Sequence, residues 1–261
     1  MAIPTIGRRA SEYFAPQPNK DFEYRIGTGM IPSAEWSIFM DDFLQPWIPG
    51  TAITNGAVAQ TPSNWQAAVI DSGATVAVNT TAAIGANGVL TIADATASEG
   101  AAVYGQKTVQ LTVGKKFWME ARLRTGDVTD NAIVFGLSDL TATTNPEDLW
   151  TTTADNVISF GLGDGDSNPK FLCVDAGNSG TSQQVQTLRG MSVDTWHILA
   201  IYFDGKYLHG YVDGRLALTW AGAAATIPTG VALAPFFGAL SGNGAGGNVN
   251  VFDYVRWVSE R

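Results

Sequence analysis

Short runs with β character follow one another from residue 39 to residue 258, and Gly, Asn, Asp and Thr separate them. Little of the chain has a helical pattern: 145–150 predicts a single turn, capped by Asn145 with Pro146 in its first position. Many strands at short spacing with so little helix predict an all-β sandwich or barrel. The expected strands are 39–44, 65–70, 75–78, 88–93, 101–104, 109–113, 117–124, 132–137, 157–162, 170–174, 184–188, 197–203, 207–212, 216–220, 233–237 and 249–258.

The run 117–124, "FWMEARLR", alternates as a half-buried antiparallel strand does. One face would carry Phe117, Met119, Ala121 and Leu123, and the other Trp118, Glu120, Arg122 and Arg124. The run 197–203 is apolar on both faces, which suits a central strand. Asp213-Gly214 stands between two further runs and predicts a hairpin with a type I′ turn.

Four short motifs occur in a fixed order: "FMDDF", "FWMEARLR", "GYVDGRLAL" and "FDYVRW". Together they resemble the concanavalin A-like, laminin G-like jelly-roll superfamily. Its members commonly begin with an Asp-Phe strand, carry a Tyr-Val-Asp-Gly hairpin and end on a strand such as Asp-Tyr-Val-Arg-Val, as family 16 glycoside hydrolases do. The resemblance covers residues 38–258.

This resemblance implies an antiparallel β-sandwich of the jelly-roll type. In such sandwiches the first and last strands usually pair, so we expect 39–44 to lie beside 249–258. Cross-strand aromatic contacts would then hold the two ends of the domain together. The aromatic residues of "FDYVRW" are accordingly interpreted as mainly structural.

Composition excludes several classes of protein. Apolar residues make up 45% of the 261 residues and charged residues 15%, which is enough for a core and too few charges for a disordered chain. The net charge of −9 does not favour nucleic acid as a partner. The sequence contains neither a run of 18 apolar residues nor a secretory h-region, so we expect no membrane partner and synthesis in a cytoplasm.

The sequence lacks the residues that glycoside hydrolysis needs. That reaction usually takes two carboxylates that flank the scissile bond, and family 16 enzymes place theirs on one strand as Glu-x-Asp-x-Glu or Glu-x-Asp-x-x-Glu. Glu120 is the nearest candidate, but its neighbours on the same face are Trp118, Arg122 and Arg124. We therefore predict that the protein is not an enzyme.

Other chemistries find no support either. His197 and His209 do not stand at metal-ligand spacing with Cys173, which we expect to be a small buried hydrophobic residue on a strand. No Gly-x-Ser-x-Gly motif occurs. The Gly-x-Gly-x-x-Gly match at 242–247 leads into a strand instead of a helix, so a loop explains it better than a dinucleotide site.

A calcium site is the one cofactor for which the sequence offers candidate ligands. Asp164, Asp166 and Asn168 present oxygen atoms at alternate positions, as calcium loops do, and laminin G-like domains often bind calcium. The glycine and the distal glutamate of an EF-hand are missing, and Pro169 follows. A β-turn rich in Asp and Gly is the competing interpretation, so no cofactor is predicted beyond this candidate site.

Residues 1–37 differ from the rest and are predicted to form an arm, whereas 38–261 form the sandwich domain. Prolines interrupt any helix in the segment, and aromatic residues are scattered along it without a period. The arm either wraps over its own domain or docks on a neighbouring subunit. The residues that we expect to anchor it are Arg8, Arg9, Tyr13, Phe14, Phe22 and Tyr24.

Two non-enzymatic functions remain, of which a virion structural protein is the first. The acidic body, rich in Ala, Gly and Thr, resembles laminin G-like proteins encoded among the structural genes of tailed bacteriophages. We expect a capsid decoration protein on the outer surface of the virion, anchored by its arm to the major capsid protein or other virion subunits, with a homotrimer as the favoured oligomer.

The second function is a carbohydrate-binding or host-adhesion module, such as a tail or fibre component. The fold is a common lectin scaffold, and the chain has eight tryptophans. Sugar sites use an exposed aromatic platform with a few polar groups, and Trp47, Trp65 and Trp150 are the candidates for such a platform. Host-surface glycans would be the ligands. The alternative is that these rings cover the edges of the sandwich.

Overall fold

The structure is a computed structural model, and the part of it described below consists only of β-strands and the turns between them. It covers residues 36–41, 43, 53–54, 58–60, 65–70, 74–79, 88–93, 100–128, 131–139, 156–162, 170–175, 180–185, 190–220, 227–241 and 249–260. Within these ranges, none of the elements is a helix able to cross a membrane.

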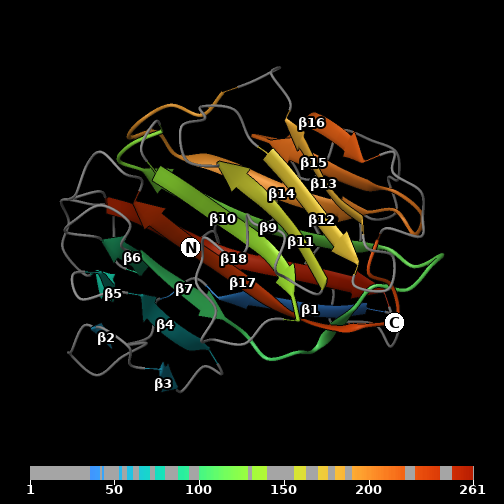
Figure 1. Cartoon of the computed structure of the whole chain (residues 1–261), viewed down its shortest axis with the longest axis horizontal. Helices are drawn as coiled ribbons and strands as arrows, with labels where there is room; N and C mark the ends of the chain where they lie inside the picture. The colour runs from blue at the N-terminus through green and yellow to red at the C-terminus, as the bar shows by residue number, and fades with distance from the viewer. Residues whose placement is uncertain are drawn as a thin grey trace, which may run out of the picture.

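Two antiparallel sheets, sheet A and sheet B, make up the fold (Figure 1). Sheet A has nine strands with β9 and β18 at its centre. In spatial order they are β16 (Arg215–Trp220), β15 (Leu208–Val212), β14 (His197–Phe203), β9 (Phe117–Thr125), β18 (Val249–Glu260), β6 (Val89–Ala93), β5 (Thr75–Asn79) and β2 (Ile53–Thr54), with β1 (Trp36–Asp41) also paired to β18.

Sheet B also has nine strands, and β10 and β17 are central in it. In spatial order they are β13 (Gly180–Val185), β12 (Lys170–Asp175), β11 (Asn156–Leu162), β10 (Asn131–Ser138), β17 (Ala232–Ser241), β7 (Gly100–Tyr104), β4 (Gln66–Ile70) and β3 (Val58–Gln60), with β8 (Val109–Gln110) also paired to β17. The predicted all-β antiparallel sandwich is therefore confirmed.

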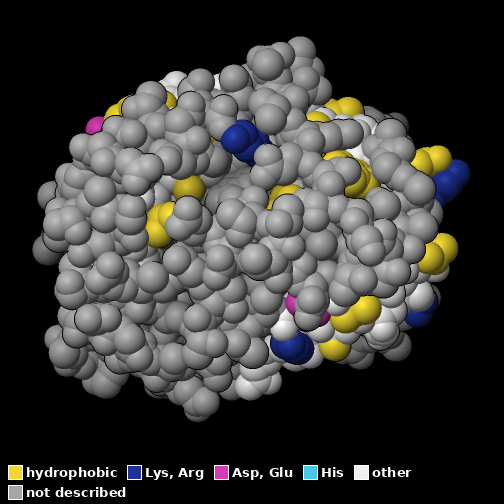
Figure 2. Space-filling model, viewed as in Figure 1, with side chains coloured by type: hydrophobic (Ala, Val, Ile, Leu, Met, Phe, Trp, Pro, Cys, Tyr) yellow, Lys and Arg dark blue, Asp and Glu magenta, His cyan; other side chains and the backbone are white. Residues whose placement is uncertain are grey.

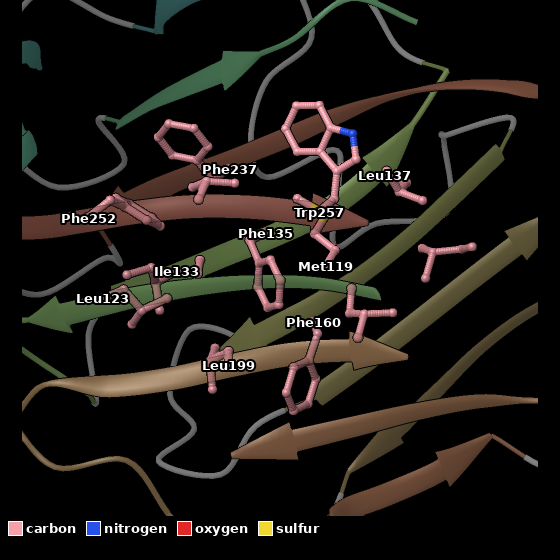
Figure 3. Packing of buried hydrophobic residues seen from close by; sticks show 14 of the residues in the cluster. Met119, Leu123, Ile133, Phe135, Leu137, Phe160, Leu199, Phe237, Phe252 and Trp257 are labelled. Carbon is pink, nitrogen blue, oxygen red and sulfur yellow. The ribbon is translucent and has the colours of Figure 1, made fainter. Parts of the chain in front are cut away.

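The core lies between the two sheets and consists of the alternate residues of each strand (Figure 3). The face of β9 that was predicted to be buried does contribute to it, as do the large residues of β10 and β11. Core residues labelled in Figure 3 are Met119, Leu123, Leu199, Phe252 and Trp257 from sheet A and Ile133, Phe135, Leu137, Phe160 and Phe237 from sheet B. Because side chains alternate along a strand, every second residue is left on the outer face of its sheet.

The first and last strands pair as the sequence predicts. β1 runs antiparallel to β18, and Phe39 stands opposite Trp257. Their rings stack with centroids 3.9 Å apart, and Trp65 meets the Trp257 ring edge-on at 6.1 Å. This aromatic contact joins the two ends of the described chain. Since β1 begins at Trp36, the sandwich starts slightly before the predicted boundary at residue 38.

Local predictions agree closely with the structure where a strand alternates clearly. β14 matches the expected range 197–203, and the hairpin turn has positive φ at both Asp213 (50°) and Gly214 (73°), as a type I′ turn requires. β13 starts four residues before the expected 184–188, and its sequence "GTSQQV" has little apolar pattern to fix it. The short strands β2 and β3 were not predicted.

Candidate binding site

The outer face of sheet A is organised around a buried carboxylate, that of Glu120 on β9. Glu120 has no exposed surface. Its Oε1 accepts hydrogen bonds from the Tyr254 hydroxyl at 2.8 Å and from Arg256 Nε at 2.7 Å, and its Oε2 accepts one from Trp118 Nε1 at 2.9 Å. The antiparallel register explains the set, because Glu120 stands directly opposite Arg256 on β18.

These contacts give Glu120 a structural role. Both carboxylate oxygens already face donors, and the side chain is enclosed, so a substrate cannot reach it. Burial, together with the negative charge of Glu120, raises the pKa of Tyr254 well above its usual range. Tyr254 is therefore a neutral hydrogen-bond donor to Glu120 at any ordinary pH.

A β-bulge places a second carboxylate further along the same face. Phe252 pairs with Leu123 and Tyr254 pairs with Arg122, so Asp253 is an extra residue on β18 that has no partner on β9. The bulge brings the Asp253 carboxylate to Arg122, whose Nη1 donates to Oδ2 at 2.5 Å. Their side chains are 38% and 30% exposed, so this ion pair, unlike Glu120, is open to solvent.

Trp196, the residue before β14, packs against two arginines of β9, Arg122 and Arg124. The guanidinium of Arg122 lies 4.6 Å from the centre of its ring and that of Arg124 lies 5.8 Å from it. Arg124 Nε is also 4.0 Å from Asp194 Oδ1. We call Trp196, Arg122, Arg124, Asp194 and Asp253 the Trp196 cluster. All five are at least partly exposed.

The loop 190–196 carries Trp196 and Asp194 to the edge of β9. Asp194 has a positive φ of 53° and donates its backbone N–H to the Thr125 carbonyl at 2.9 Å. Asp tolerates this left-handed conformation better than most residues. The loop is also bonded to His197, since the Ser192 N–H donates to Nε2 at 3.0 Å. The position of the Trp196 ring therefore depends on the backbone bonds of this loop.

The arrangement retains hydrogen-bonding capacity. A guanidinium carries five N–H donors, and the bond to Asp253 uses one donor of Arg122. Arg124 Nε is buried and makes no hydrogen bond within the described part of the chain. An aromatic ring beside planar donors and carboxylate acceptors suits a small polar ligand, because one side of such a ligand packs on the ring while its rim forms hydrogen bonds.

The outer face of sheet B differs in chemistry. The outward residues of its central strands β11, β10, β17 and β7 are mainly Gly, Ala and Ser, among them Gly136, Ser159 and Gly161. The described side chains on this face include neither Asp nor Glu. A pair of catalytic carboxylates is therefore not present on the described strands of this face.

Figure 2 shows one side of the molecule, where coloured hydrophobic and charged side chains are scattered between residues outside the described ranges. They do not gather into a single patch in that view. Among the described residues, no group of three or more His, Cys, Asp or Glu side chains stands where it could hold a metal ion. The Trp196 cluster is thus the candidate site that the described geometry offers.

The structure places Trp65 and Cys173 in the core. Trp65 is 1% exposed, and its ring meets Phe39, Phe237 and Trp257, so it presents no platform to a glycan. This corrects its assignment as a platform candidate, since it closes one end of the core instead. Cys173 is buried on β12 as predicted.

The remaining predicted site residues lie outside the described residues. These are the platform candidates Trp47 and Trp150, the calcium candidates Asp164, Asp166 and Asn168, and the arm residues Arg8, Arg9, Tyr13, Phe14, Phe22 and Tyr24. Their roles stay predictions.

Sequence reasoning placed two of the five residues of the Trp196 cluster. The alternation of β9 correctly placed Arg122 and Arg124 on the outer face with Glu120. It missed Trp196 and Asp194, which precede a strand, and Asp253, which reaches Arg122 only through the bulge. The sequence signal that was available is the pair of consecutive polar residues, Asp253 and Tyr254, which breaks the alternation of β18.

Comparison with known proteins identifies the fold and no closer relationship. No protein-family model and no curated protein matches the chain. Solved structures do match it over most of its length. A protein of unknown function, SO2946 from Shewanella oneidensis MR-1, is 11% identical with a TM-score of 0.55, over 94% of this chain and 96% of that one.

Two further structures have assigned roles. The catalytic domain of an endo-1,3-β-glucanase (laminarinase) from Thermotoga petrophila RKU-1 is 14% identical, with a TM-score of 0.54 over 87% of this chain and 99% of that one. Peanut lectin is 11% identical, with a TM-score of 0.50 over 87% of this chain and 98% of that one. The fold is thus the concanavalin A-like jelly roll of lectins and glycoside hydrolases, as the sequence motifs implied.

Proposed function

We propose that this chain is a carbohydrate-binding module that does not hydrolyse its ligand, and that the ligand lies on the Trp196 cluster. The observation that carries the proposal is the contact of Arg122 with the partly exposed Trp196 ring, beside the ion pair of Arg122 and Asp253. A sugar offers an apolar C–H face that packs on an aromatic ring. Its hydroxyl groups form hydrogen bonds with charged side chains beside that ring.

Hydrolysis is disfavoured by the arrangement of the carboxylates. Glu120 is enclosed by Trp118, Tyr254 and Arg256, and a general acid must reach the leaving oxygen of its substrate. The outward side chains described on sheet B supply no acid at all. A binding role needs no such pair, so it fits these residues better than a glycosidase role does.

The shared fold supports the proposal without deciding it. A lectin and a glucanase both have this jelly roll, so the scaffold suits proteins that act on or bind carbohydrate. Unrelated functions occur on a single fold, so the argument depends on the cluster itself.

A glycan array followed by calorimetry on the selected sugar tests the proposal. We expect selective binding by the full chain, and Trp196→Ala should weaken it by about tenfold or more, since the loss of one aromatic contact at a binding centre costs about 1.5–2 kcal/mol. Arg122→Ala should weaken binding as well, because it removes both the stacking partner and the Asp253 contact.

Tyr207→Ala is the matched control. Tyr207 is also a partly exposed aromatic residue under a cation, with Lys206 Nζ 4.6 Å from its ring centre, but it lies in the turn between β14 and β15. The Tyr207→Ala variant should bind sugar with the same affinity as the unchanged protein. If Tyr207→Ala abolished binding and Trp196→Ala did not, the assigned site would be wrong. Release of sugar from a β-glucan would refute the non-hydrolytic role.

The virion decoration role predicted from the sequence stays a second proposal. It depends on the proline-punctuated, aromatic segment 1–37, which a subunit could use to anchor on a lattice. Binding of carbohydrate by the sandwich is compatible with it, because a module displayed on a particle can contact host glycans.

A further inference from the structure

His197 links the Trp196 cluster to a neighbouring hairpin. It is the first residue of β14, is 5% exposed, and follows directly after Trp196. On one side its Nδ1 lies 3.0 Å from Asp213 Oδ2, in the turn between β15 and β16. On the other side its Nε2 lies 3.0 Å from the backbone nitrogen of Ser192, in loop 190–196.

These two contacts determine the tautomer of the neutral ring, that is, which of its two nitrogens carries the proton. A backbone N–H can only donate, so Nε2 must carry a lone pair to accept from Ser192. The single proton of the neutral ring then sits on Nδ1 and is donated to Asp213. Asp213 is itself held in place, because its Oδ1 accepts the Ile198 N–H at 3.0 Å and its N–H donates to the Ile198 carbonyl at 2.8 Å.

Protonation of His197 would affect the two contacts in opposite ways. A proton on Nε2 would place two N–H donors 3.0 Å apart, so the bond from Ser192 would be lost. The contact with Asp213 would instead become a full ion pair. The imidazolium would therefore stay beside the hairpin while loop 190–196 loses one of its anchors.

The charged groups nearest to His197 come from the hairpin turn and from β9. Asp213 is the nearest of them, with its Oδ2 3.0 Å from Nδ1. Arg122 and Arg124 flank Leu123, which is the partner of His197 on β9, and they oppose a further positive charge. Each arginine also has an acidic neighbour of its own: Asp253 lies beside Arg122, and Asp194 lies 4.0 Å from Arg124.

The remaining anchors of the loop are few. Asp194 donates to the Thr125 carbonyl, Met191 is 4% exposed, and Asp194 and Trp196 contact the two arginines, while the other described residues from 190 to 195 are exposed. A segment with so few buried contacts opens at low cost. Loss of the Ser192 bond would therefore move Asp194 and Trp196 relative to Arg122 and Arg124.

We propose that His197 is a pH-sensitive latch: its protonation releases Ser192 and loosens loop 190–196, so that ligand binding at the Trp196 cluster weakens in acid. The effect on binding rests on the proposed function, whereas the release of the loop does not. His197 acts here as a positioning residue, because it touches the loop and not the ligand.

Hydrogen exchange of the full chain, measured without ligand from about pH 8 to about pH 5 and corrected for intrinsic exchange, tests the release of the loop. We expect protection of the Ser192 amide to fall by about two- to tenfold across this range, which is the effect of losing one backbone hydrogen bond. NMR of the chain's two histidines assigns the event, since His197 and His209 give the only imidazole signals.

Variants separate a latch from a simple structural contact. His197→Gln keeps a neutral acceptor toward Ser192, so its loop protection should be independent of pH. Asp213→Asn removes the anion that favours the imidazolium, so the transition should move to lower pH. His209→Gln is the matched control, because His209 contacts Asp204 and Thr219 instead of the loop, and it should behave as the unchanged protein does.

Constant protection of Ser192 across the range in the unchanged chain would overturn the latch. So would an unshifted transition in Asp213→Asn, or a transition that disappears in His209→Gln and persists in His197→Gln. Loss of protection in acid without sugar binding at any pH would support the latch and refute the proposed function. Sugar affinity that falls with the same pH profile as loop protection would support both.

Discussion

At the scale of single residues, Glu120 and Arg256 form an ion pair on the outer face of sheet A, and the carboxylate of this pair is fully buried. Glu120 has no exposed surface, and Arg256 Nη2 lies 2.6 Å from its Oε1. Tyr254 and Trp118 supply the other donors. A buried ion pair adds little net stability when intact, but the removal of one partner leaves an uncompensated buried charge.

We therefore expect Arg256→Met to lower the free energy of unfolding by about 3–5 kcal/mol. The double variant Glu120→Gln, Arg256→Met should recover part of this loss, because no charge is then left unpaired. Urea unfolding followed by fluorescence measures both. Arg215→Met is the matched control: Arg215 is exposed on β16, and the change should stay within about 0.5 kcal/mol. A loss below about 1 kcal/mol for Arg256→Met would contradict this account.

The role of a single residue could be predicted from the sequence only where its neighbours along the chain determine that role. Cys173 was correctly expected to be buried, because a strand of apolar residues surrounds it. The exposure of Trp65 was not predictable in this way, since its burial comes from Phe39 and Trp257, near the two ends of the domain. Asp253 likewise has a role only because a bulge turns it toward Arg122.

At the scale of the elements, glycines fix how closely β10 and β11 approach. A Cβ on Gly136 would lie 2.0 Å from the Ile158 carbonyl oxygen, and a Cβ on Gly161 would lie 2.0 Å from the Ile133 carbonyl oxygen. Both contacts are with backbone atoms, which cannot turn away. The two strands therefore hold their spacing only while these positions lack a side chain.

Gly136→Ala and Gly161→Ala should each lower the free energy of unfolding by about 1–3 kcal/mol, because an added methyl group must push the strands apart. Thermal unfolding of each variant measures the effect. Gly126→Ala is the control, since its nearest neighbours, the Val249 backbone atoms, are 3.4 Å away, and it should change stability little. Stabilisation by either strand substitution would contradict the close approach of β10 and β11.

The strands themselves were well predicted wherever apolar residues alternate or run together. β9, β14 and β18 begin at the expected residues, because each has a core-facing set that fixes its register. The range of β13 was predicted wrongly, since its sequence "GTSQQV" has little apolar alternation from which a strand could be placed. The short strands β2 and β3 carry too few residues for a pattern.

At the scale of the whole molecule, β1 closes the sandwich against β18. Phe39 stacks on Trp257 and contacts Trp65, and Phe43 is fully buried. β1 begins at Trp36, so the sandwich and the preceding segment can be separated at residue 35. This boundary allows residues 1–35 to be removed without cutting β1.

Deletion of residues 1–35 should leave a folded sandwich, whereas deletion of 1–43 should lower the free energy of unfolding by several kcal/mol, since burial of each large aromatic side chain contributes about 1.5–3 kcal/mol. Calorimetry of the two truncated chains compares them directly. An equal loss of stability in both would show that the arm belongs to the fold. If the chain that lacks residues 1–35 still bound to virion subunits with unchanged affinity, the predicted anchoring role of this segment would be refuted.

The sequence determined the fold class, because strand periodicity and turn chemistry are local along the chain and predict an all-β sandwich or barrel. The jelly-roll topology and the pairing of the end strands were implied by the resemblance of four motifs to a known superfamily. The sequence also excluded a family 16 carboxylate motif, which would stand on one strand. Only the tertiary structure decided which side chains make a site. Arg122 and Asp253 are 131 residues apart in the chain, and His197 and Asp213 are 16 apart. Their contacts depend on strand order, on one bulge and on one turn, and no local pattern specifies how these combine in space.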